Sequence, residues 1–192
     1  RHLPFIDFRP YKIGNNLPEQ MIAEEQPIIE YVFEKDGKEV RSLQYLSAQE
    51  GYTYKASSVL NEEATIAKIT DYNVIDVEGN DVTSQTFSGV KLFIIINDVE
   101  KSQLKYMSEI TNLVNALDGK IETMILTSSG EEAFEKFRHE HQLAAPFYFS
   151  DATVIKAMIR ANPGIMLLNN GTVLGKWHNN DTPDVGEIVD LL

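Results

Sequence analysis

Residues 162–178 read NPGIMLLNNGTVLGKWH, and this stretch decides the fold of the second half of the chain. Two runs of apolar, strand-forming residues flank Asn170-Gly171, a pair that favours the type I′ turn of a two-residue β-hairpin. Pro163 precedes the first run, and cis X-Pro bonds occur mainly in tight turns of this kind. The stretch therefore predicts a β-hairpin that begins at a cis proline.

Hydrophobic periodicity predicts alternating strands and helices before this hairpin. The continuous apolar run within residues 90–97 is typical of a strand buried on both faces. Leu104, Met107, Ile110, Val114 and Leu117 recur at three- and four-residue spacing, which predicts a helix over residues 102–117. Further predictions are a strand over residues 121–129, helices over residues 129–142 and 151–161, and a last helix from near Pro183.

Two serines are predicted to cap these helices. Ser102 precedes the first apolar stripe and would accept a free backbone N–H of the helix as its N-cap. Ser129 is followed three residues later by Glu132, which is the spacing of a capping box.

The order strand, helix, strand, helix, hairpin, helix resembles the thioredoxin-like fold. We therefore expect an α/β core over residues 89–192, with a mixed central sheet flanked by helices. Parallel strands joined by crossover helices connect with right-handed geometry, and this leaves few other topologies.

Residues 1–88 are predicted to form an N-terminal extension, rich in β-hairpins, that packs on this core. IIEYVFEKDGKEVRSL places Asp36-Gly37 between two strand-like runs, which is a strong hairpin signal. ITDYNVIDVEGNDVTSQ repeats the arrangement around Glu78-Gly79-Asn80. Residues 48–67 have weak periodicity and are expected to be a loop with a short helix.

Composition excludes several classes of function. The 192 residues carry 17 Lys and Arg against 29 Asp and Glu, a net charge of −12, and this balance repels nucleic acid and anionic lipid. No run approaches the roughly 20 apolar residues of a membrane helix. The chain has no cysteine, so disulfides, thiolate metal sites and thiol catalysis are excluded within it.

In thioredoxin-like folds the redox pair lies between the first core strand and its helix and faces the cis proline. The corresponding segment here is residues 97–103, which contains no thiol. An activated serine at Ser102 would need a nearby base, and the local sequence supplies none. We expect instead a binding groove whose candidate residues are Asp98, Glu100, Lys101, Ser102, Asn162, Pro163, Trp177 and His178.

No cofactor, metal or catalytic residue is predicted. His139 and His141 lie two apart on a predicted helix and would point in different directions. The acidic turn with Asp76, Glu78 and Asp81 lacks the ligand spacing of a calcium loop. Glycine-rich phosphate-binding motifs are also absent from the sequence.

Two segments resemble the C-terminal region of DoxX-family membrane proteins from Bacteroidetes. They are HLPFIDFRPYKIGNNLPEQM at residues 2–21 and KAMIRANPGIMLLNNGTVLGKWH at residues 156–178. The resemblance implies an excised soluble region, anchored in the inner membrane by segments before Arg1 and facing the periplasm.

Three functions remain open from these observations. The first is a non-redox module that binds an unidentified protein or peptide partner, without nucleic acid. The second is an accessory domain of a quinone-linked membrane oxidoreductase. The third is a non-thiol enzyme or small-ligand binder that uses Trp177, His178 and nearby carboxylates, which would require a concave pocket with convergent polar groups.

Overall fold

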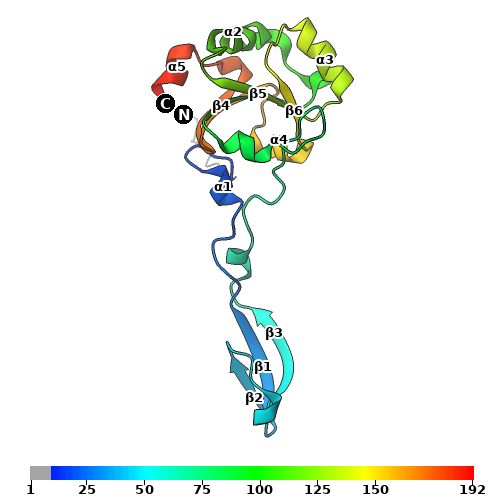
Figure 1. The fold of residues 1–192 in the computed structure, drawn as a ribbon, viewed down its shortest axis with the longest axis vertical. Coiled ribbons are helices and arrows are strands. Elements are labelled where there is room, and N and C mark those ends of the chain that lie inside the picture. The colour runs from blue at the N-terminus through cyan, green and yellow to red at the C-terminus, as the bar shows by residue number, and fades with distance from the viewer. Residues whose placement is uncertain (1–9) are drawn as a thin grey trace, which may run out of the picture. The chain divides into compact units, whose positions relative to one another are not determined.

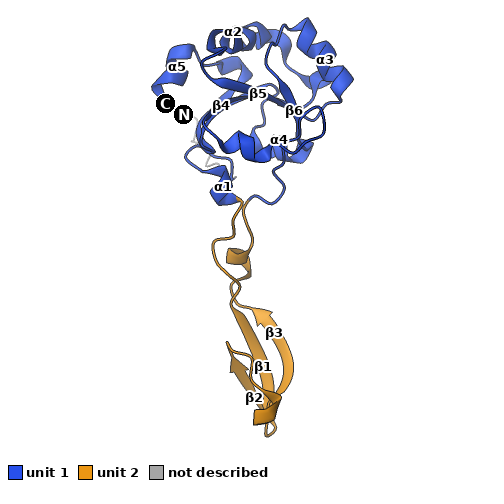
Figure 2. Ribbon diagram, viewed as in Figure 1, with its two compact units in different colours: residues 1–20, 69–192 blue, residues 21–68 orange. Residues whose placement is uncertain are grey.

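A computed structural model describes residues 10–192, which fall into two compact units (Figure 2). The first unit joins the chain up to Gln20 to Ile69–Leu192, and the second unit is Met21–Lys68. This division differs from the predicted boundary at residue 88. Leu17, Tyr72 and Val74 are fully or almost fully buried, so the chain on both sides of the second unit contributes to the core of the first.

A five-stranded mixed sheet forms the centre of the first unit, in the order β6-β5-β4-β7-β8 (Figure 1). β4 (Val90–Ile96), β5 (Glu122–Thr127) and β6 (Phe147–Phe149) are parallel to one another. β7 (Gly164–Asn169) is antiparallel to β4, and β8 (Thr172–His178) is antiparallel to β7. The predicted mixed sheet flanked by helices is confirmed.

Helices cover both faces of this sheet (Figure 1). α2 (Met107–Leu117), α3 (Glu131–Glu140) and α5 (Val185–Asp190) share one apolar cluster with Leu92, Ile94 and Ile96 of β4. α4 (Ala152–Met158) lies on the other face, toward which the alternate β4 residues Phe93 and Ile95 point. Strand β4 is therefore buried on both sides, as its continuous apolar run predicts.

The β7–β8 turn agrees with the sequence prediction. Asn170 and Gly171 both have positive φ, at 47° and 80°. A type I′ turn requires positive φ at both of its central residues, which asparagine and glycine tolerate best.

The chain before α1 (Leu17–Gln20) runs along this hairpin. The N–H groups of Gly14 and Leu17 donate to the carbonyls of Val173 and Gly171, and the Val173 N–H donates to the Asn15 carbonyl. This pairing covers part of the open edge of β8. Residues 2–9, which belong to one of the segments that resemble DoxX proteins, lie outside the described residues.

Both predicted serine caps are wrong. The helix expected from residue 102 begins at Met107, after two 3-10 turns, and Leu104 is 52% exposed instead of lying on the apolar stripe. The Ser102 hydroxyl donates to the Asp98 carbonyl, and the Ser129 hydroxyl accepts from the Val99 N–H. Backbone groups outside the helices bind both hydroxyls, a local carbonyl for Ser102 and a distant N–H for Ser129.

The second unit contains an antiparallel sheet in the order β2-β1-β3. β1 (Ile29–Lys35) and β2 (Lys38–Ser42) form the hairpin predicted at Asp36-Gly37. β3 (Thr53–Val59) was not predicted, because its residues are small or polar and nearly all exposed. Pairing with β1 holds this strand in place.

The hairpin predicted around Glu78-Gly79-Asn80 is a loop rather than two strands. A single bridge pairs Ile75 with Asp81, and Ile75 also pairs with Phe149 at the end of β6. The Asp76 carboxylate accepts the N–H groups of Glu78 and Asn80, and this closes the turn locally. Strand β6 was not predicted, because it has only three residues.

The remaining short elements are 3-10 turns at Ala48–Glu50, Glu62–Thr65, Thr83–Phe87, Val99–Lys101, Leu104–Tyr106 and Asn179–Asp181. Within residues 10–192, every helix is too short or too polar to cross a bilayer.

Candidate functional site

The candidate site lies where the carboxyl ends of β4, β5 and β6 meet. Parallel strands bring the loops that follow them to one edge of the sheet, and ligands of α/β proteins bind at such edges. The loop after β4 contains the predicted slot, residues 97–103. The short connection from α4 to β7, residues 159–163, approaches it from the antiparallel half of the sheet.

Asp98 organises the loop after β4. Its carboxylate accepts the Glu100 N–H at 3.0 Å and forms an ion pair with Lys101, also at 3.0 Å. The hydrogen bond and positive charge of Lys101 hold the pKa of Asp98 below its usual value, and Asp98 in turn raises the pKa of Lys101. The position of the expected redox pair is therefore held by a charge-paired turn.

Asn162 ties the two loops together. Its side-chain amide donates to the Asp98 carbonyl at 2.7 Å, and its own carbonyl accepts the Gln103 N–H at 2.9 Å. The Gln103 side chain in turn accepts a hydrogen bond from Asn179, which is completely buried. The Asn162 carbonyl therefore already accepts one hydrogen bond within the chain.

Pro163 is buried immediately before β7, and the Asn162–Pro163 bond is cis. A parallel β4–α2–β5 unit is thus followed by an antiparallel hairpin. The cis proline stands at the start of this hairpin and faces the loop after β4. The first unit has a thioredoxin-like fold. The cis proline predicted from the sequence is confirmed.

A hollow of about 610 Å³ opens beside this proline loop. Its floor contains Ala157, Ile159 and Ala161, which are half-buried or buried. Its polar lining residues are Asn97, Asp98, Lys101, Lys156, Arg160 and Asn162. We call this hollow, with these nine residues, the proline-edge hollow.

The structure brings three of the eight predicted groove residues to this hollow. Asp98, Lys101 and Asn162 line it. The Ser102 hydroxyl donates to the Asp98 carbonyl and Glu100 is exposed, but neither residue lines the hollow.

Trp177 and His178 are positioned by β8 and do not line the hollow. The Trp177 side chain packs against the apolar cluster that includes Ile188 of α5. His178 lies opposite Gly164 in the β7–β8 ladder, and its Nδ1 accepts the Asn180 N–H at 3.3 Å. The histidine thus ends the strand and begins the next turn.

Sequence reasoning missed the basic side of the hollow. Lys156 and Arg160 are four residues apart at the C-terminal end of α4 and just beyond it. The only sequence signal was this spacing in a helix that follows a core strand. Asn179 was also missed, because nothing local distinguishes it from an exposed turn residue.

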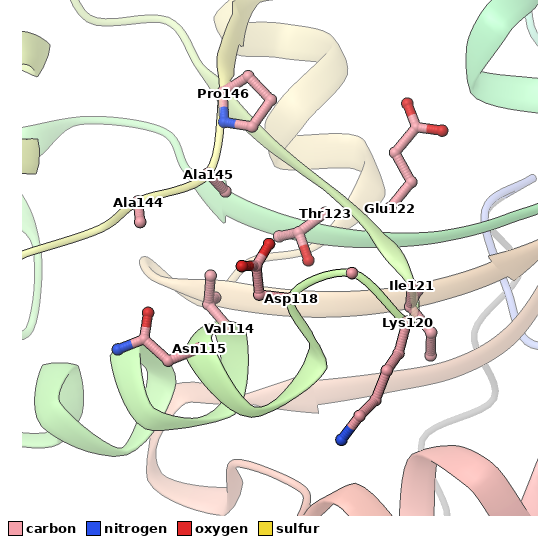
Figure 3. Close-up of a pocket in the computed structure, with 11 residues that line it drawn as sticks. Val114, Asn115, Asp118, Lys120, Ile121, Glu122, Thr123, Ala144, Ala145 and Pro146 are labelled. Carbon is pink, nitrogen blue, oxygen red and sulfur yellow. The ribbon is translucent and has the colours of Figure 1, made fainter.

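A second hollow, of about 400 Å³, lies at the opposite end of the parallel strands, between the end of α2 and the start of β5 (Figure 3). Asp118 points toward Thr123 there, whereas Lys120 points away from both. The Thr123 hydroxyl is buried and has no hydrogen-bond partner within residues 10–192. This hollow lies away from the proline loop and contains no residue of the predicted groove.

Among the described residues, no group of three or more His, Asp and Glu side chains could hold a metal ion. His139 lies 3.6 Å from Glu135, while the His141 ring packs on Phe137 with 4.4 Å between centroids. The two histidines therefore have separate partners.

No family model matches the chain, and no curated protein matches it. Solved structures similar to it include the thioredoxin domain of a thiol-disulfide oxidoreductase from Bacteroides vulgatus, at 18% identity and a TM-score of 0.46, covering 62% of this chain and 88% of that one. A thiol-disulfide oxidoreductase from Bacteroides fragilis is 14% identical, with a TM-score of 0.49, and covers 64% and 97%. A thiol peroxidase from Chromobacterium violaceum is 16% identical, with a TM-score of 0.45, and covers 64% and 82%. The fold assignment rests on the strand order and the position of Pro163.

Proposed function

We propose that the thioredoxin-like unit is a non-redox module that binds a protein or peptide partner at the proline-edge hollow. The observation that carries this proposal is a hollow of about 610 Å³ beside a thioredoxin-like proline loop, in a chain without cysteine. Because function belongs to sites placed on a fold, a thioredoxin-like scaffold without thiols can still present a binding edge.

The loop chemistry supports binding rather than thiol exchange. Hydrogen bonds with the amide and the carbonyl of Asn162 hold residues 97–103, and the exposed Asp98–Lys101 ion pair adds a contact of small value, so the slot is occupied by an ordered polar turn. The hollow offers a partner the aliphatic floor, which is Ala157, Ile159 and Ala161, and a basic rim, which is Lys156 and Arg160. A surface with an apolar centre and a polar rim is typical of protein interfaces.

We further propose that this module is the periplasm-facing part of a membrane protein of the DoxX family. The support is the resemblance of residues 2–21 and 156–178 to that family, and the membrane anchor would lie in segments outside these 192 residues. Fractionation of cells that express the full-length protein tests this placement. The module should sediment with membranes and be digested when protease is added to spheroplasts; recovery in the cytosolic fraction would contradict it.

Site-specific photo-crosslinking tests the binding function. A benzoylphenylalanine replacing Ala157 places the crosslinker on the floor of the hollow, and one replacing Lys136 places it on the exposed face of α3 as a control. In the native envelope, the probe at 157 should give a discrete adduct with one protein that the probe at 136 does not give. An adduct pattern that is the same for both positions, or no adduct at 157, would contradict a partner at this hollow.

A further inference from the structure

We propose that the proline-edge hollow selects an acidic peptide segment, in which one carboxylate side chain pairs with Arg160 and Lys156 while neighbouring apolar side chains cover the floor. This inference rests on the proposed function and adds the chemical class of the partner.

The charge of the hollow is opposite to that of the protein. Three of its lining side chains, Lys101, Lys156 and Arg160, are cationic, and Asp98 is its one carboxylate. The whole chain, by contrast, carries a net charge of −12. A local basic site on an acidic protein steers an anionic segment to one place and repels it elsewhere.

The cations of the hollow are not equally available. Lys101 is already paired with Asp98. Within residues 10–192, neither Lys156 nor Arg160 forms an ion pair. We therefore assign Arg160 as the main contact for the carboxylate of the partner, because its planar guanidinium can hold a carboxylate through two parallel hydrogen bonds.

Two further carboxylates lie close to the rim. The hydrogen bond from the Thr153 N–H at the start of α4 is the main cause that lowers the pKa of Asp151, and the positive charge of Lys156 lowers it further. Glu100 is exposed next to Lys101 and acts on it through its charge. Neither one lines the hollow, so Lys156 and Arg160 remain the groups that face a ligand there.

The floor favours a peptide over a small anion. Ala157, Ile159 and Ala161 contribute aliphatic side chains to the lining of the hollow. Inorganic phosphate would contact the cations but leave this surface exposed to water. A segment with an aspartate or glutamate beside small apolar residues contacts both.

Selection from a library of randomised peptides displayed on phage tests the inference. The 192-residue chain is the target at about 0.15 M salt, and the enriched peptides are synthesised and titrated against four variants. Lys156→Glu with Arg160→Glu reverses the rim, and Ala157→Gln fills the floor without a charge change. Lys136→Glu is the matched charge reversal on α3, and Lys156→Gln with Arg160→Gln keeps the rim neutral in case the reversed rim perturbs folding.

Enriched peptides should carry an excess of Asp and Glu. Their affinity should fall about tenfold or more on reversal of the rim, less on its neutralisation, and not at all with Lys136→Glu. Replacing the acidic residues of a selected peptide by Gln and Asn should have the same effect as neutralising the rim.

The two proposals fail differently in this experiment. Selected peptides that lose affinity with Ala157→Gln bind at the hollow. If such peptides are not acidic, or if their affinity does not change with the rim variants, the acidic specificity is overturned and the binding function stands. A selection in which no peptide depends on Ala157 or on the rim overturns both.

Discussion

Asn162 joins the loop after β4 to the entry of β7 through one side chain and one carbonyl. The amide donates to the Asp98 carbonyl at 2.7 Å, the carbonyl accepts the Gln103 N–H, and Pro163 follows. Since the loop after β4 and the entry to β7 have no ladder between them at this point, these bonds hold the edge of the sheet together.

Asn162→Ala should therefore destabilise the protein. Losing the amide removes one donor from the partly buried Asp98 carbonyl, which still accepts the Ser102 hydroxyl and the Lys101 N–H, so the cost is that of one hydrogen bond, about 0.5–1.5 kcal/mol. Urea denaturation should show a lower midpoint, while Asn115→Ala on the exposed face of α2 should change it little. Equal midpoints for the two variants would mean that Asn162 does not hold the loops.

Gly175 is required by a close approach of the single tryptophan. A Cβ at this position would lie 2.1 Å from Cη2 of Trp177, so the indole ring rests directly on the glycine.

Gly175→Ala should displace this ring and cost about 1–3 kcal/mol, as overpacking does. Because Trp177 is the one tryptophan, its fluorescence should shift to longer wavelength as the ring becomes exposed. Gly130→Ala is the control, because a Cβ there meets nothing within 4 Å and φ is −63°. An unchanged emission spectrum in the Gly175 variant would show that the ring is not packed on β8.

The two sheets are stabilised in different ways. β4 is buried on both faces between helices, whereas β1 supplies the small sheet with Phe33, which is 1% exposed and is surrounded by the rings of Tyr31, Tyr45, Tyr52 and Tyr54. Ion pairs of Arg41 with Glu30 and Glu39, and of Lys55 with Glu34, add exposed contacts of small value. Phe33 is the one apolar side chain of the second unit that is fully buried.

Phe33→Ala should unfold the second unit and leave the first intact. Deleting a buried phenyl ring costs about 3–5 kcal/mol, and the second unit has no other buried apolar side chain to compensate. Amide NMR spectra should lose dispersion for residues 21–68 and keep it for residues 69–192. Ile66→Ala, which removes an exposed side chain from the same unit, should leave both sets unchanged; loss of dispersion throughout the chain would show that the units fold together.

The core of the first unit holds two tyrosines whose ionisation opposes folding. Burial raises the pKa of both Tyr11 and Tyr72 well above the usual value, and for Tyr11 the charge of Asp71 adds to this. The Tyr72 hydroxyl donates to Thr86 at 2.9 Å. In the unfolded chain both tyrosines ionise near pH 10, whereas in the folded protein they stay neutral at that pH. Their contribution to the free energy of unfolding is therefore complete below about pH 10 and is lost as the pH rises above it.

Alkaline titration should therefore separate the eight tyrosines into two groups. Tyrosinate absorbance should rise first for exposed residues, and the last increments should coincide with loss of circular dichroism. Tyr72→Phe should weaken the fall of stability with pH, whereas Tyr45→Phe, at a side chain that is 64% exposed, should not. Ionisation of all tyrosines before any loss of structure would contradict the buried environment.

Local patterns predicted the elements that long apolar runs or turn pairs specify. β4, α2 from Met107 and the β7–β8 hairpin follow from burial, helical spacing and the Asn170-Gly171 turn. β3 and β6 did not follow, because a small polar strand and a three-residue strand owe their conformation to their neighbours. The serine caps failed because backbone groups outside the helices bind the hydroxyls: the nearby Asp98 carbonyl for Ser102 and the distant Val99 N–H for Ser129.

The thioredoxin-like order of elements, the proline entry to β7 and the lack of cysteine could be read from the sequence, because each depends on residue type and short-range spacing. The return of the chain to the first unit at Ile69 depended on contacts between residues far apart in sequence. So did the meeting of Asp98 with Asn162, which are 64 residues apart, and of both with Lys156 and Arg160 around one hollow. Parallel strands carry loops from separate parts of the chain to one edge, and only folding brings their charges together.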